Sequence, residues 1–120
     1  MSDRVQKFED LKVWKEAMRL TVEIYREMQE CKDFGFKDQI QRAAVSVPSN
    51  IAEGYERQSN KEFMQYLFIA KGSCGEMRTQ LYLAIELDYL GKETGKTLLD
   101  KTHKISAMLF KLIKTRKENF

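Results

Sequence analysis

Apolar residues recur every three or four positions along most of this chain. That spacing is typical of amphipathic α-helices, in which one turn takes about 3.6 residues. It predicts four helices, over about residues 8–31, 37–57, 60–90 and 95–117. No segment shows the strict alternation of a strand, so we expect an all-α fold. Four amphipathic helices with short loops favour one antiparallel up-down four-helix bundle that takes up residues 1–120.

The breaks between the predicted helices contain turn and capping residues. Gly35 lies in the first break, and Ser59 or Asn60 can cap the third helix. Gly91 stands where helices commonly end on glycine, and Thr94 can cap the fourth helix. These residues set the helix boundaries that we expect.

The first helix has a wide apolar face, because two apolar stripes lie side by side along it. The first stripe contains Leu11, Trp14, Met18, Thr21, Tyr25 and Met28, and the second contains Val13, Ala17, Leu20, Ile24 and Cys31. Together they cover roughly half of the helix circumference. A contact with a single helix needs less, so we expect the first helix to pack against more than one neighbour.

The second helix contains the only proline of the chain, Pro48. A proline inside a helix removes a hydrogen bond and costs about 3 kcal/mol. The helix either kinks at this residue or breaks into two short helices. The apolar positions stay in phase across Pro48, which favours a kink. Ser46 or Ser49 can hydrogen-bond the backbone carbonyl that Pro48 leaves free.

The middle of the third helix contains Gly72 and Gly75. Each glycine costs a helix about 1 kcal/mol relative to alanine. This predicts the close approach of another helix, near Pro48. Glu76 and Gln80 share a face with three apolar residues, which are Ile69, Leu83 and Leu87. A carboxylate among apolar residues needs a cation, and we expect Glu76 to pair with one of two arginines of the second helix, which are Arg42 and Arg57.

The other face of the second helix is polar. It contains Arg42, Ser46, Ser49, Asn50, Glu53 and Arg57. This face is either an ordinary solvated surface or a strip that meets another helix. We assign structural roles to Arg42, Pro48, Glu53, Arg57 and Glu76.

Two segments carry a resemblance to a known family. They are RAAVSVPSNIAEGYER, residues 42–57, and FMQYLFIAKGSCGEMRTQL, residues 63–81. The chain resembles the bacterial four-helix-bundle proteins encoded in intervening sequences of 23S ribosomal RNA genes, some of which are labelled ribosomal proteins. The most specific part is the S-x-P-S-N-I-A-E-G run, residues 46–54.

The resemblance implies a homo-oligomer, with a pentameric ring as the expected form, and a connection with nucleic acid. A related branch, the accessory variability proteins of diversity-generating retroelements, is similar to a basic pentameric barrel that works with a reverse transcriptase and RNA. Nothing in this chain assigns it to that branch.

The sequence contains no recognisable catalytic or metal-binding arrangement. His103 is the only histidine, and we expect it to lie on the surface. Cys31 and Cys74 have no metal-type spacing and fall at apolar helical positions, which is typical of small buried thiols. We therefore expect no enzymatic activity, no cofactor and no metal.

Positive charge gathers near the C-terminus of the chain. Between residues 101 and 117 no acid separates the basic residues, which are Lys101, Lys104, Lys111, Lys114, Arg116 and Lys117. The first four lysines lie opposite the apolar stripe. Such a face suits sequence-independent contact with phosphates, and a solubilising surface is the alternative. No exposed aromatic residue clearly interleaves with these lysines, so we expect backbone recognition without base reading.

The first helix also has neighbouring basic and acidic stripes, which either form ion pairs on a solvated face or match across a subunit interface. The sequence as a whole predicts a non-enzymatic homo-oligomer that associates with RNA through its fourth helix. The alternative is a protein-interaction scaffold without a nucleic-acid role, whose partner the sequence does not identify.

No apolar run approaches the ~18 residues of a membrane span, and the polar N-terminal segment lacks a signal-peptide core. We therefore expect a cytoplasmic protein without membrane contact.

Overall fold

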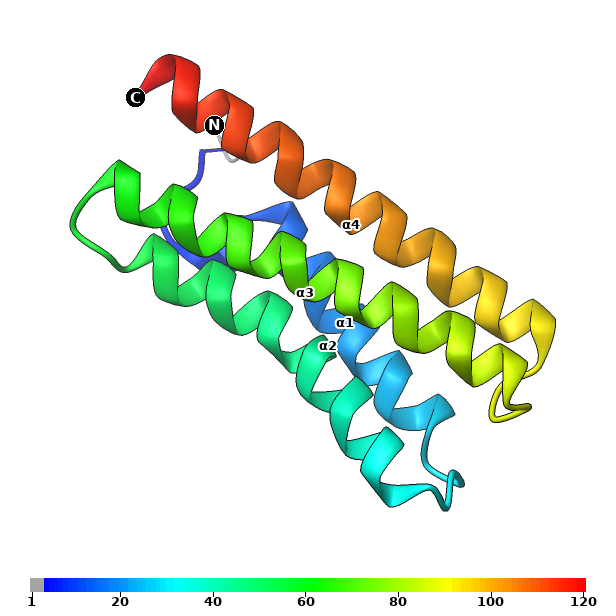
Figure 1. The fold of residues 1–120 in the computed structure, drawn as a ribbon. Coiled ribbons are helices and arrows are strands. Elements are labelled where there is room, and N and C mark those ends of the chain that lie inside the picture. The colour runs from blue at the N-terminus through cyan, green and yellow to red at the C-terminus, as the bar shows by residue number, and fades with distance from the viewer. Residues whose placement is uncertain (1–3) are drawn as a thin grey trace.

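The computed structural model describes residues 4–120 of the chain. Within them lie a short 3-10 turn and four α-helices: η1 (Phe8–Asp10), α1 (Lys12–Glu27), α2 (Phe34–Tyr55), α3 (Asn60–Glu86) and α4 (Lys92–Asn119) (Figure 1). The described residues contain no strand. The predicted all-α four-helix bundle is confirmed.

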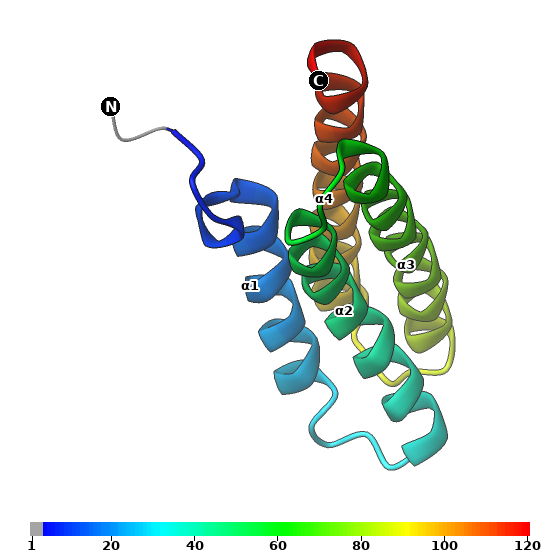
Figure 2. The same ribbon diagram turned by 90° about the vertical axis from the view of Figure 1, so that its left-hand side faces the viewer.

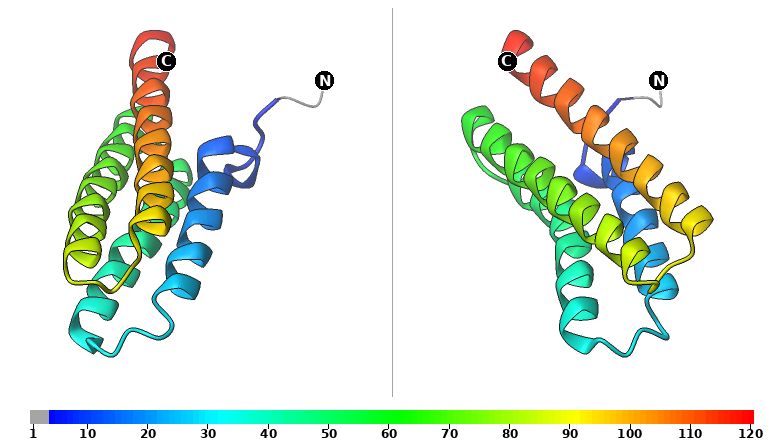
Figure 3. Two further views of the ribbon diagram at one scale, coloured as in Figure 1. Left: turned by 90° about the vertical axis from the view of Figure 1, so that its right-hand side faces the viewer. Right: turned by 45° about the vertical axis from the view of Figure 1, so that its right-hand side comes forward.

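The four helices form a rod about 45 Å long. Each helix lies beside the next one along the chain, and α1 also contacts α4. Figure 2 shows α1 at one edge of the bundle, next to α2. The last turns of α4 project past the start of α1, as the red end of the ribbon in Figure 3 shows.

The first helix is shorter than its periodicity suggested. Leu11 has an extended backbone, which separates the 3-10 turn Phe8–Asp10 from α1. This conformation buries Leu11 and brings the rings of Phe8 and Trp14 edge to face, with centroids 5.4 Å apart. The prediction of one helix over residues 8–31 is wrong, because the extended backbone of Leu11 interrupts it at the start and α1 ends at Glu27.

The capping residues of the second and third helices are Asp33 and Ser59. The side chain of Asp33 accepts a hydrogen bond from the backbone N–H of Phe36, so α2 begins at Phe34. Gly35 therefore lies inside α2 and not in the turn. The cap expected at Ser59 is confirmed, since its hydroxyl accepts a hydrogen bond from the Glu62 N–H at 3.1 Å.

The turn between α3 and α4 also differs from the expectation. Asp88 has φ of 61° and ends the helix in the left-handed conformation that we expected a glycine to supply. Gly91 instead precedes the first residue of α4, and Thr94 lies within α4. An aspartate tolerates this conformation better than most residues, and its sequence signal is weaker than that of glycine.

Side chains from all four helices fill the core. The largest fully buried ones are Leu20, Ile24, Met28, Ile40, Val47, Ile51, Leu67, Met77, Leu81, Leu98, Ile105 and Leu109. The second predicted stripe of the first helix lies inside, except for Cys31, which is half-buried, and of the first stripe only its two ends, Leu11 and Met28, are buried. On the other stripe Met18 is 41% exposed and Tyr25 is 44% exposed, and the neighbouring Val22 is 43% exposed. The bundle of one chain thus leaves part of the apolar surface of α1 uncovered.

The close helix contacts occur at glycines other than those predicted. Gly72 has open space around it, and a methyl group at Gly75 would meet only the end of the Arg78 side chain, 4.0 Å away. In contrast, an added Cβ at Gly54 would lie 2.5 Å from the Cβ of Tyr66, and one at Gly95 would overlap Ile85. The prediction for Gly72 and Gly75 is wrong, because both lie on the side of α3 that faces away from α2.

Helix α2 continues without interruption through Pro48, so the alternative of two short helices is wrong. The missing N–H of Pro48 leaves the carbonyl of Ala44 without its helical donor. The hydroxyl of Thr21 on α1 lies 3.0 Å from this oxygen and 2.8 Å from the Ala17 oxygen. The prediction that a serine of α2 serves this carbonyl is wrong, because Thr21 reaches it from the neighbouring helix. The bend near Pro48 stays a prediction.

Candidate nucleic-acid interface

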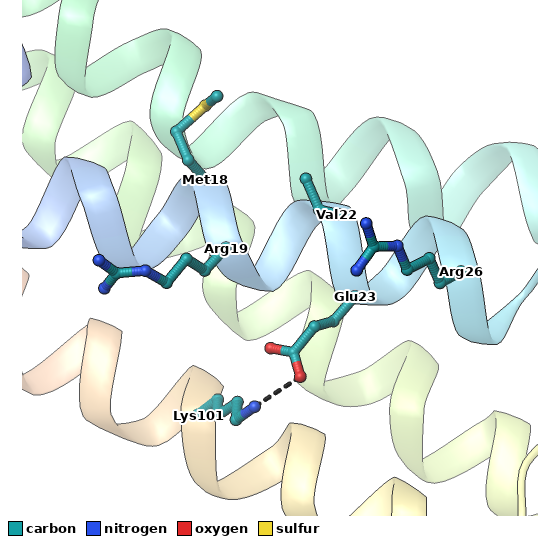
Figure 4. Close-up of a pocket in the computed structure, with 6 residues that line it drawn as sticks. All are labelled: Met18, Arg19, Val22, Glu23, Arg26 and Lys101. Atoms are coloured by element: carbon teal, nitrogen blue, oxygen red, sulfur yellow. Dashed lines mark hydrogen bonds and ion pairs between the residues drawn. The ribbon is translucent and has the colours of Figure 1, made fainter.

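Two of the six predicted phosphate-binding residues face α1. Lys101 Nζ lies 2.6 Å from a carboxylate oxygen of Glu23, and Lys104 Nζ lies 4.0 Å from a carboxylate oxygen of Glu16 (Figure 4 shows the Lys101 pair). Lys101 is half-buried beside α1, so its expected place opposite the core is wrong. Glu23 thus pairs with Lys101 within the chain, whereas Glu16 lies nearer to Arg19, at 3.1 Å, and shares its charge between Arg19 and Lys104.

The Lys101–Glu23 pair borders an open hollow of about 500 Å³. Figure 4 shows Met18 and Val22 on the far side of this hollow from Lys101. Arg19 and Arg26 complete its lining. The hollow therefore combines exposed apolar atoms with charges on the outer side of α1.

Arg116 stabilises the packing of α4 on α3. Its guanidinium carbon lies 4.9 Å from the ring centroid of Phe63 and 3.8 Å from that of Phe120. Its Nε donates a hydrogen bond to the side-chain oxygen of Asn60 at 2.7 Å, and the Asn60 amide donates to the Arg116 carbonyl. Burial lowers the pKa of Arg116. These contacts give Arg116 a structural role, and we remove it from the candidate interface.

Lys111, Lys114 and Lys117 are exposed, and none of them forms an ion pair with another described residue. Lys114 and Lys117 line a hollow of about 480 Å³ together with Phe68, Phe110, Ile113 and Glu118. Phe68 is 57% exposed and Phe110 is 58% exposed. The expectation that no exposed aromatic residue accompanies the lysines is wrong.

A signal for this aromatic pair existed in the sequence. Phe110 directly follows the buried Leu109 and so lies outside the apolar stripe of α4. It precedes Lys114 by four positions and Lys117 by seven, which places all three on one side of the helix. Phe68 follows the buried Leu67 in the same way, but its position beside α4 required the packing of two helices.

The predicted ion pair of Glu76 does not form. Glu76 is exposed, and Arg42 and Arg57 instead pair with Asp38 at 2.8 Å and Glu53 at 3.1 Å. Each carboxylate of α2 lies four residues before its arginine, which is a favourable spacing, and Arg57 itself lies just past the end of α2. The apolar residues on the Glu76 side, Ile69, Leu83 and Leu87, are also exposed, so only Gln80 of that predicted face is buried.

The polar face of α2 meets α3 at two points. The hydroxyl of Ser46 lies 2.8 Å from that of Ser73. Farther along, the hydroxyl of Tyr66 donates to Glu53 at 3.1 Å, and Arg57 donates to the same hydroxyl at 2.5 Å. These contacts support the structural roles of Glu53 and Arg57.

The histidine and cysteine side chains do not combine with acidic side chains into a catalytic or metal-binding cluster among the described residues. Among residues 4–120 no cluster of three histidine, cysteine or acidic side chains is arranged to hold a metal ion. His103 is exposed, as predicted. Cys74 is buried, and desolvation raises the pKa of its thiol to about 11, so the thiol is protonated at neutral pH. In the described part of the chain no helix has the length and apolar character that a membrane crossing requires.

Comparison with known proteins agrees with this fold. The family model described as 23S rRNA-intervening sequence protein matches residues 9–111. The chain belongs to this family. The resemblance identified from its sequence is thereby confirmed. A comparison with curated proteins found no match.

Solved structures also match this 23S rRNA-intervening sequence protein. One is the crystal structure of a protein with unknown function from the S23 ribosomal protein family of Bacteroides thetaiotaomicron. It is 29% identical in sequence, with a TM-score of 0.81, and the match covers 86% of this chain and 99% of that chain. Neither description names an enzymatic activity.

Proposed function

We propose that this protein is a non-enzymatic homo-oligomer that binds RNA through the C-terminal half of α4. The observation that carries the proposal is the row of three exposed lysines, Lys111, Lys114 and Lys117, which have no carboxylate partner among the described residues. They extend over about 9 Å of the helix axis. Unpaired ammonium groups on a rigid helix suit contact with the phosphates of RNA.

Self-association accounts for the exposed apolar side of α1. Met18, Val22 and Tyr25 lie on this helix, and Val45 of α2 is exposed as well. Burial of such a surface against another copy removes it from water. We keep the pentamer as the proposed form, because a ring would repeat the lysine row of each subunit and raise the affinity for a long RNA. A cytoplasmic location belongs to the same proposal.

A protein-interaction scaffold is the second candidate function. Ile69, Leu83 and Leu87 are exposed on α3, on a side away from the lysine row. This uncovered apolar surface favours a protein partner. Salt distinguishes the two functions, because phosphate binding weakens steeply with salt and an apolar interface does not.

The proposed function is tested by light scattering with and without a structured RNA, at about 50 mM and about 200 mM salt. We expect a pentamer that gains RNA mass at the lower salt and loses most of it at the higher salt. The triple variant Lys111→Gln, Lys114→Gln, Lys117→Gln should lose this gain. A matched control, Lys15→Gln, Arg26→Gln, Lys32→Gln, changes the net charge equally at three other exposed basic residues and should keep the gain.

Equal RNA binding by both triple variants would overturn the assignment to α4. A pentamer that ignores RNA at either salt would favour the scaffold function. A monomer would remove the oligomer from the proposal.

A further inference from the structure

Two exposed aromatic rings lie in a groove between α3 and α4. More than half of each side chain, Phe68 and Phe110, is open to solvent. They line one hollow of about 480 Å³, together with the alkyl chains of Lys114 and Lys117. Large aromatic side chains usually contribute to a core or an interface. These two contribute little to the core, and their rings are open to contact with a ligand.

The α3 side of the groove adds two further cations. Lys71 and Arg78 recur with Phe68 and Tyr82 at helical spacing, so the four residues share one side of α3. Lys71 and Arg78 are half-buried, and neither forms an ion pair with another described residue. Both charges act on the pKa of the nearby Cys74 thiol and lower it against the effect of burial. Lys71 and Arg78 therefore add positive charge to the side of α3 that carries Phe68, next to the residues that line the hollow itself.

The two walls run alongside each other. Asn60 at the start of α3 contacts Arg116 near the end of α4, and Ile85 near the end of α3 lies against Gly95 near the start of α4. The aromatic and basic side of α3 therefore follows α4 along its length. Tyr82, which is 55% exposed, lies about 21 Å along the axis from Phe68.

We propose that this groove binds single-stranded RNA, with bases stacked on Phe68 and Phe110 and phosphates on Lys114 and Lys117. The inference rests on the proposed function and names the form of RNA and the mode of contact. Aromatic platforms in a positively charged groove are the recurring solution for single strands, since every unpaired base offers a flat face. A duplex hides these faces within its own stack.

The charge of the groove argues against a second copy of the chain as its occupant. Two copies that met groove to groove would bring the same unpaired cations together, and like charges repel. In a ring, where each groove would meet a different surface of the next copy, we assign self-association to the exposed apolar side of α1 instead. Interface centres between proteins are also depleted of lysine. Only one carboxylate, that of Glu118, lines the hollow. An anionic ligand with flat apolar faces satisfies both the cations and the rings.

The experiment is a fluorescence anisotropy titration of full-length protein with a labelled oligouridine of about ten nucleotides and with a duplex RNA of equal length. We expect the single strand to bind more tightly. Phe68→Ala and Phe110→Ala should each weaken single-strand binding by about tenfold, with little change for the duplex. The slope of affinity against salt should stay the same, because neither ring carries charge.

Two variants serve as controls. Leu87→Ala removes an apolar side chain of similar exposure that lies outside the hollow, and this variant should bind like the unaltered protein. Phe110→Trp keeps a stacking ring and should keep the affinity. Circular dichroism checks that the helices remain in every variant.

Each other outcome has a defined meaning. Normal single-strand binding by both alanine variants, with loss of binding in the Lys114→Gln, Lys117→Gln variant, would overturn the inference and leave the proposed function intact. A change of oligomeric mass without a change in RNA affinity would show that the groove is a subunit interface and would also overturn it. Failure of the unaltered protein to bind either RNA would remove both proposals.

Discussion

The two halves of α4 have similar lysine spacing but different surroundings. In the first half, Lys101 and Lys104 face the carboxylates of Glu23 and Glu16 on α1. In the second half, Lys111 lies beside a different part of α1, where Lys12 lines the same hollow. Acidic residues of α1 thus lie beside the lysines of the first half only, and the close pair is that of Glu23 with Lys101. The comparison shows that a lysine on the surface of α4 is available to a ligand only where the adjacent helix places no carboxylate beside it.

The aromatic residues separate the two halves further. The exposed Phe110 follows the paired lysines and shares a hollow with Lys114 and Lys117. The first half has no exposed large apolar residue between Lys92 and Phe110. This difference supports our proposal that only the second half contacts RNA, while the first half packs against α1.

The largest expected effect is a loss of RNA affinity when the lysines of the second half of α4 lose their charge. The Lys111→Gln, Lys114→Gln, Lys117→Gln variant should bind a single strand roughly 100-fold more weakly at about 50 mM salt, if three phosphate contacts are lost. The Lys101→Gln, Lys104→Gln variant should change the affinity by less than about threefold, since its lysines already have partners. Filter binding at one low salt concentration measures both variants. Similar losses in the two variants would contradict the division of α4.

A smaller expected effect is a loss of stability when Arg116, near the C-terminal end of α4, is replaced. Arg116→Gln removes two ring contacts and a fixed charge and should lower the free energy of unfolding by about 1–2 kcal/mol. Urea denaturation measures this loss. At temperatures where the variant stays folded, its RNA affinity should remain within about threefold of the unaltered protein, because Arg116 packs on α3. A tenfold loss of affinity in a stable Arg116→Gln protein would return Arg116 to the interface.

The ion pair of the first half should contribute little to stability. Lys101 and Glu23 are both partly solvated, and exposed pairs contribute about 0.2–1 kcal/mol. Glu23→Gln should therefore lower the free energy of unfolding by at most about 0.5 kcal/mol after allowance for solvent screening. High salt should reduce the difference, which thermal unfolding at two ionic strengths measures. A larger, salt-independent loss would show that Glu23 stabilises the core in another way.

The smallest expected effect is a pH dependence of the free energy of unfolding. It arises where the turn between α1 and α2 meets the chain just after α3. Tyr89 donates a hydrogen bond to Asp33 at 2.6 Å. This bond and the Phe36 N–H lower the pKa of Asp33 in the folded state, and the carboxylate raises the pKa of Tyr89. The Asp33 contribution should be present above its unfolded pKa of 3.8 and lost as pH falls through the lower folded pKa.

The Tyr89 contribution has the opposite sign. It should be present below the unfolded pKa of 10.0 and lost as pH rises through the higher folded pKa. Tyr89→Phe should remove the alkaline dependence and weaken the acidic one, as thermal unfolding between pH 3 and pH 11 would show. An unchanged profile would contradict a role for this bond.

The sequence predicted the fold well because the apolar period is long and regular. It placed Val13, Leu20 and Ile24 correctly in the core. The predicted helix boundaries were wrong where the backbone conformation of a single residue ends the helix. The extended backbone of Leu11 and the left-handed conformation of Asp88 depend on packing that periodicity does not encode.

The candidate site was only partly predictable for a related reason. The sequence identified a basic helix. It could not show that Lys101 pairs with Glu23, because this pair depends on the side of α4 on which α1 packs. The close contact at Gly54 had a signal, since this residue shares the apolar face of Ile51. The donor for the Ala44 carbonyl had none, because Thr21 lies on another helix.

Ultraviolet cross-linking of bound RNA, followed by mass spectrometry of the peptides, tests the central claim most directly. It reports which residues touch RNA without altering any of them. The account predicts cross-linked peptides from the C-terminal half of α4, around Phe110 and Lys114, and from α3 around Phe68. Cross-links confined to α1 and α2 would contradict it.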